Sequence, residues 1–117
     1  MNDLWTNAEQ TTRGYREVDP MTLASFEDAD VRIIDVREAS EYMGPLGHIA
    51  GSELVPLGEL SEHLDDWDRQ DTLVVVCRSG GRSGRAAQML VAEGFSRVIN
   101  LRGGMMAHNQ SLLPIAV

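Results

Sequence analysis

The only cysteine of the chain stands where an apolar run changes into a segment rich in glycine and arginine. The stretch "VVVCRSGGRS" covers residues 74–83 and places Cys77 at this change. Cysteine reacts as a thiolate, which is favoured by nearby cations, by backbone N–H groups and by a helix N-terminus. Arg78 and Arg82 supply cations, and the glycine pair at 80–81 lets the backbone turn successive N–H groups toward one centre. The segment therefore predicts an anion-stabilising loop in which Cys77 has a lowered pKa and acts as a nucleophile.

Core packing is the alternative interpretation of Cys77, because free cysteine is among the residue types most often buried. A phosphate-binding loop is another, but the chain contains no lysine and therefore has no GK[ST] motif. The glycines, the arginines and the position between an apolar run and a helical pattern together favour the nucleophile.

Charge is distributed unevenly along the chain. The formal net charge is −8, yet residues 72–92 contain no acidic residue and include three arginines. An acidic protein is poorly suited to nucleic acid or to an anionic membrane, so we expect neither as a partner.

The single cysteine excludes an internal disulfide, and no basic segment followed by an apolar run opens the chain. We therefore expect a cytoplasmic protein.

Short apolar runs alternate with short helical patterns. Strands are expected around residues 31–36, 53–55, 72–76 and 96–101, and helices after Pro20, over 37–43, over 57–67 and from about 83 to 93. This alternation predicts one α/β domain over residues 15–117, with a mainly parallel sheet and helices on both faces. Residues 1–14 are interpreted as an N-terminal extension or a short docking helix.

The loop after residues 72–76 lies where ligand sites gather in such sheets, at the carboxyl ends of the strands. Asp35 and Arg37 stand at the end of another expected strand. A buried carboxylate beside an arginine often holds loops together, so a structural role is favoured for this pair over a direct functional one.

The sequence resembles the single-domain rhodaneses, a family of thiosulfate-type sulfurtransferases. The resemblance covers roughly residues 15–117. The matching segments are "IIDVREASEY" (33–42), "GHIAGSELVPL" (47–57), "VVVCRSGGRSGRAAQML" (74–90), "GFSRVINLRGG" (94–104) and Pro114.

The resemblance implies a five-stranded parallel sheet flanked by helices, and a reaction in two steps. Cys77 would take a sulfane sulfur from thiosulfate or a related donor, become a persulfide and pass the outer sulfur to an acceptor. The acceptor would be a thiol, cyanide in an assay, or a protein. The implied donor and persulfide site consists of Arg78, Ser79, Gly80, Gly81, Arg82 and Ser83, with Asp35 and Arg37 in support.

Two other functions stay open. The related phosphatases and arsenate reductases have five residues between cysteine and arginine, whereas here Arg82 follows Cys77 after four, which favours sulfur transfer. Rhodanese-like domains also occur as non-catalytic interaction modules, although these often lack the cysteine.

The three histidines and two neighbouring methionines are assigned other roles. His48 is expected to be structural and His63 solvated. His108 stands where the family usually has tryptophan, so we expect a looser C-terminus or a groove beside the loop, with a role in proton transfer less favoured. Met105 and Met106 are expected to pack, or to form an adaptable rim for an acceptor. No metal-ligand spacing is present, and we predict neither a metal nor a cofactor.

Overall fold

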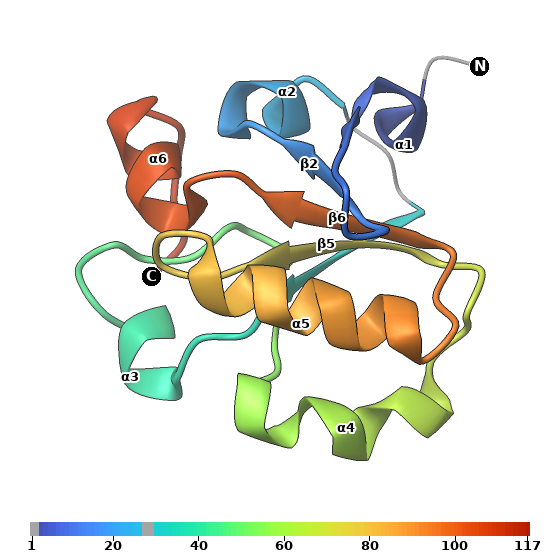
Figure 1. Ribbon diagram of the computed structural model, residues 1–117. Helices are drawn as coiled ribbons and strands as arrows, with labels where there is room; N and C mark the ends of the chain where they lie inside the picture. The colour runs from blue at the N-terminus through green and yellow to red at the C-terminus, as the bar shows by residue number, and fades with distance from the viewer. Residues whose placement is uncertain (1–2, 27–29) are drawn as a thin grey trace.

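The computed structural model of the chain describes residues 3–26 and 30–117, which form an α/β domain (Figure 1). The strands are β1 (Glu9–Gln10), β2 (Arg16–Val18), β3 (Val31–Asp35), β4 (Glu53–Leu54), β5 (Thr72–Val76) and β6 (Arg97–Leu101). The α-helices are α1 (Leu4–Asn7), α2 (Pro20–Ala24), α3 (Ala39–Tyr42), α4 (Leu60–His63), α5 (Gly81–Ala92) and α6 (Gly104–Gln110). Two 3-10 turns, Leu57–Glu59 and Leu64–Asp66, flank α4.

The sheet contains six strands in the order β1-β2-β6-β5-β3-β4. All neighbouring pairs are parallel except β1 and β2. The expectation of a mainly parallel sheet with helices is confirmed, but the count of five strands is wrong. The additional strand is β1. After it the chain turns at Gly14, which has a left-handed φ of 90°, and returns as β2 antiparallel to β1. Its two residues are polar and exposed, so they give no apolar strand signal.

The segment before β1 packs onto the same sheet. Asp3 caps α1 by accepting a hydrogen bond from the N–H of Thr6 at 2.8 Å, and Leu4 is completely buried. Arg16 donates to the carbonyl of Trp5 at 2.8 Å and covers its ring. The first turn of helix is thereby attached to β2.

Helices cover both faces of the sheet, with α4 and α5 on one side and α1 and α2 on the other (Figure 1). Successive residues of β5 point to opposite faces. Leu73 and Val75 pack under α5, whereas Val74 and Val76 pack under α1 and α2. The same alternation turns Cys77 toward α5. No helix in the described ranges is long and apolar enough to cross a membrane.

Candidate active site

Cys77 follows β5 directly, and the loop after it ends at the first residue of α5. Gly80 caps this helix with φ 107°, in the left-handed region that favours glycine. In this conformation the N–H of Gly80 donates to Sγ of Cys77 at 3.0 Å. The hydroxyl of Ser83, in the first turn of α5, lies 3.3 Å from the same sulfur. The loop therefore curls around Sγ, as the glycine pair predicts.

The electrostatic environment of the sulfur combines two opposing effects. Burial raises the pKa of the Cys77 thiol, because it disfavours the charged form. The Ser83 side chain, as a hydrogen-bond partner of the sulfur, and the donating backbone N–H groups of Ser83, Gly80 and Ser79 act in the other direction. The hydrogen bonds prevail, and the pKa lies below the ordinary value of a thiol. This is the predicted direction.

The start of α6 is hydrogen-bonded to the backbone of the loop that follows β5. The N–H groups of Met105 and Met106 donate to the carbonyls of Cys77 and Arg78, both at 2.9 Å. Gly104 has φ 56°, and a Cβ atom there would collide with the carbonyl oxygen of Cys77. This contact was not predicted from the sequence. The glycine pair at 103–104 is the sequence feature that could have indicated a close approach of the backbone there. Packing is thus the observed role of Met105, which is completely buried.

Arg82 is paired with an acidic residue that the sequence reasoning did not single out. Its two terminal nitrogens each donate to an oxygen of Glu41, both at 2.7 Å. The Arg82 guanidinium holds the pKa of the Glu41 carboxyl at about 2. Arg78 is exposed and, with Arg37, Glu41 and two apolar residues, lines a pocket of about 260 Å³ beside the loop. The binding of an anionic sulfur donor by both Arg78 and Arg82 stays a prediction.

Asp35 and Arg37 form a buried ion pair behind this pocket. Both side chains are only 1% exposed, and Nη2 of Arg37 lies 2.8 Å from Oδ2 of Asp35. Arg37 also donates to the carbonyls of Glu41 and Gly47, at 3.3 and 2.8 Å. These contacts fix the segment that carries Glu41, which is the kind of loop-holding role favoured from the sequence.

Within the described part of the chain, none of the three histidines forms a hydrogen bond with the sulfur of Cys77. His48 stacks on Tyr42 at 3.7 Å between ring centres, and His63 is exposed on α4. His108 is buried and donates from Nε2 to the carbonyl of Pro114 at 2.9 Å. It lines a pocket of about 480 Å³ near α1 and α2, and none of residues 77–83 lines this pocket. The groove expected beside the loop therefore lies elsewhere. The C-terminus, which was expected to be looser, is attached to the rest of the domain by the backbone pairing of His48 with Ala116.

The sequence of the chain matches a known family. A family model for the rhodanese-like domain aligns with residues 22–111 of the chain. The chain belongs to the rhodanese-like family. Its fold agrees with that of a rhodanese-related protein from Thermoplasma volcanium, with a TM-score of 0.76, 28% identity and coverage of 86% of this chain and 96% of that one.

Several curated relatives carry names from sulfur metabolism. Thiosulfate sulfurtransferase GlpE from Pseudomonas fluorescens is 32% identical over 77% of this chain and 81% of its own length. The putative sulfur carrier protein YrkF from Bacillus subtilis is 32% identical over 83% of this chain and 54% of its own length. The chain spans about half the length of this and two other curated relatives. Sulfurtransferases are thus among the relatives of this rhodanese domain.

Proposed function

We propose that this rhodanese domain is a sulfurtransferase that carries a sulfane sulfur on Cys77. The observation that supports the proposal best is the position of Sγ, which faces the N–H of Gly80 at the start of a 12-residue helix. Donors arranged in this way stabilise negative charge on sulfur, both before and after a second sulfur is attached.

The first step is an attack of the Cys77 thiolate on the outer sulfur of thiosulfate or of a related donor. A Cys77 S–S bond forms while the S–S bond of the donor breaks, and the bonding electron pair leaves with sulfite from thiosulfate or with a thiolate from a persulfide donor. In the second step an acceptor nucleophile attacks the terminal sulfur of the persulfide. The Cys77 thiolate then departs as the leaving group, and its lowered pKa favours this departure.

The surroundings of the loop suit a small anionic donor. Arg78 lies exposed at the pocket beside the loop, and the α5 N-terminus adds a partial positive charge. Because the chain has one cysteine, a second cysteine of the same chain cannot take up the sulfur. The acceptor is therefore an external thiol, cyanide in an assay, or a partner protein.

Mass spectrometry of the intact protein tests this proposal. After incubation with thiosulfate and removal of excess donor, we expect a mass gain of one sulfur in the wild type and none in Cys77→Ser. A panel that includes persulfides of small thiols would then rank the donors. Wild-type protein that stays unmodified with every donor would contradict the proposal, and so would an equal gain in Cys77→Ser.

A further inference from the structure

A chain of hydrogen bonds leads from the sulfur of Cys77 into the sheet. Oγ of the completely buried Ser83 lies 3.3 Å from Sγ and 2.5 Å from Oδ1 of Asn100 on β6. Asn100, which is 3% exposed, donates from Nδ2 to Oε2 of Glu17 on β2 at 3.0 Å. A carboxylate on a neighbouring strand is thus linked to the nucleophile through two buried side chains.

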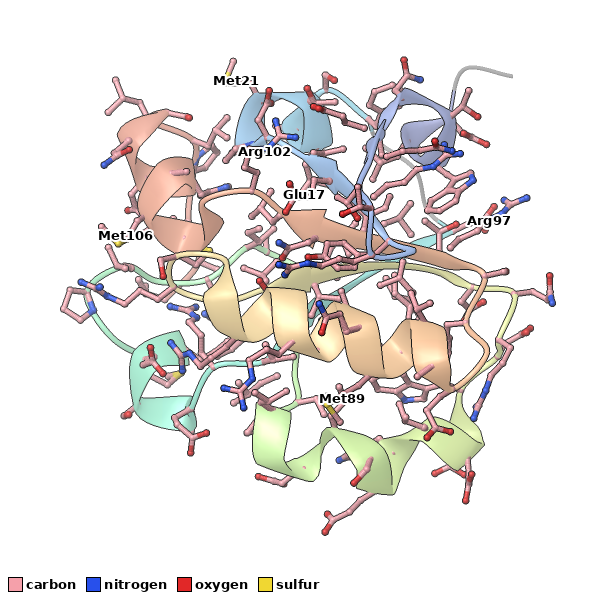
Figure 2. The ribbon with its side chains drawn as sticks, viewed as in Figure 1. Glu17, Met21, Met89, Arg97, Arg102 and Met106 are labelled. Atoms are coloured by element: carbon pink, nitrogen blue, oxygen red, sulfur yellow. The ribbon has the colours of Figure 1, made fainter. Side chains whose placement is uncertain are left out.

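Glu17 fixes the orientation of the Asn100 amide. A carboxylate only accepts hydrogen bonds, so the NH₂ group of Asn100 has to face it. The carbonyl of Gly80, another acceptor, lies 3.5 Å from the same nitrogen. Arg102 on the neighbouring chain segment donates to the other oxygen of Glu17 at 3.5 Å, and the two side chains lie near each other in Figure 2. With Glu17 in place, the amide therefore presents its oxygen to Ser83.

The hydroxyl of Ser83 has one hydrogen and three acceptors within reach. These are Sγ of Cys77 at 3.3 Å, the carbonyl of Gly80 at 3.2 Å and Oδ1 of Asn100 at 2.5 Å. The shortest contact leads to Asn100, whose oxygen has to receive a hydrogen from Ser83. We propose that Glu17 and Asn100 are positioning residues that turn the Ser83 hydroxyl hydrogen away from the sulfur of Cys77.

The chemical consequence is a limit on how far the loop stabilises the thiolate. When the hydrogen points to Asn100, a lone pair of Ser83 faces Cys77 and accepts from a thiol instead of donating to a thiolate. Thiolates with very low pKa are weaker nucleophiles, and the best attacking thiol has a pKa near the ambient pH. Glu17 and Asn100 therefore preserve the reactivity of Cys77 as a nucleophile. This consequence rests on the proposed function, in which Cys77 attacks the donor, whereas the orientation of the hydroxyl does not.

Glu17→Gln tests the orientation directly. A glutamine both donates and accepts, so the Asn100 amide becomes free to turn over and donate to Ser83, which releases the hydroxyl hydrogen toward the sulfur. We expect the pKa of Cys77 to fall by about one unit, which is the effect of one additional hydrogen bond to a charged group. The pH dependence of alkylation by iodoacetamide measures this pKa, and the only thiol that reports is Cys77.

Glu9→Gln is the matched control. Glu9 binds the same Arg102 at 2.8 Å and carries the same charge, but its exposed side chain makes no hydrogen bond to Asn100 within the described residues. We expect little or no shift in this variant. Equal shifts in Glu9→Gln and Glu17→Gln would indicate a general charge effect and would overturn the proposal. Both variants retain the charged groups around the loop, which are Asp35, Arg37, Glu41, Arg78 and Arg82.

A second comparison uses Ser83→Ala, which removes the hydroxyl. In this background Glu17→Gln should no longer shift the alkylation profile, and a shift that persists would contradict the role of Ser83. If Ser83→Ala does not fold, the comparison of Glu17→Gln with Glu9→Gln still decides the proposal. Alkylation needs no sulfur donor. A failed orientation test therefore leaves the persulfide result untouched, and a missing persulfide leaves the orientation test valid.

Discussion

Arg37 and Asp35 form an ion pair that is almost completely removed from water, with both side chains 1% exposed. Arg37 donates from Nε and Nη2 to the carboxylate at 2.9 and 2.8 Å, and it also serves the carbonyls of Glu41 and Gly47. Arg37→Met keeps much of the side-chain volume but removes the cation. Asp35 is then left as a buried carboxylate without a charged partner, and two carbonyls lose a donor.

We expect Arg37→Met to lower the free energy of unfolding by about 3–5 kcal/mol, the usual effect of removing one partner of a buried pair. Urea unfolding followed by circular dichroism measures the change. The double variant Asp35→Asn with Arg37→Met should be more stable than Arg37→Met alone, because it no longer buries an isolated charge.

The pair between Arg32 and Glu53 provides the control. It is also bidentate, with nitrogen–oxygen distances of 3.0 and 2.9 Å, but its side chains are 26% and 46% exposed. Water screens such a pair, and Arg32→Met should cost only about 1 kcal/mol. If Arg37→Met is no more destabilising than Arg32→Met, burial does not determine the strength of these pairs and the reasoning is refuted.

Three further predictions concern the loop and its surroundings. Gly104→Ala should destabilise the fold by about 2 kcal/mol or more in urea unfolding, because it combines a positive φ with a collision against the Cys77 carbonyl. Gly51→Ala, at φ 82° with open space around it, should cost less, and an equal loss would show that the collision is unimportant. Arg82 lowers the pKa of Glu41 from 4.5 to about 2, so the stability that this pair contributes is fully present above about pH 4.5 and is lost as the pH falls through about 2. The stability difference between wild type and Glu41→Gln should therefore shrink across this window in acid titrations, and a constant difference would contradict the assignment. Alkylation of Cys77 should have a lower pH midpoint in the folded protein than in concentrated urea, and coinciding midpoints would show that the loop does not stabilise the thiolate.

The central strands and the helix after the loop could be predicted because each has a strong local signal. Apolar residues fill most of β3 and β5, and the glycine pair marks the start of α5. The start of α2 is equally local, since Asp19 accepts a hydrogen bond from the N–H of Thr22 at 2.7 Å just before Pro20. These features depend on neighbours in sequence, which a pattern can show.

The contacts that complete the site could not be predicted because they join residues far apart in the chain. Glu41 reaches Arg82 across 41 residues, and Glu17 reaches Asn100 across 83. Single polar residues in short strands or in the first turns of helices have no periodicity that marks them as partners. The pairing of Glu17 with Asn100 follows from the order of the strands, in which β2 lies beside β6 although most of the chain separates them.

The spacing of Cys77 and Arg82 is an example of how the fold gives a sequence pattern its physical meaning. Four intervening residues place Arg82 at the second position of α5, and from there its side chain extends to Glu41. Its charge is thus largely balanced before any donor arrives, whereas Arg78 forms no ion pair within the described part of the chain. In the proposed reaction, the attraction of this acidic protein for an anionic donor at Cys77 therefore rests chiefly on backbone N–H groups and on Arg78. Because the N–H of Gly80 lies 3.0 Å from the sulfur and Arg78 is the next residue after Cys77, both act locally despite a net charge of −8 on the whole chain.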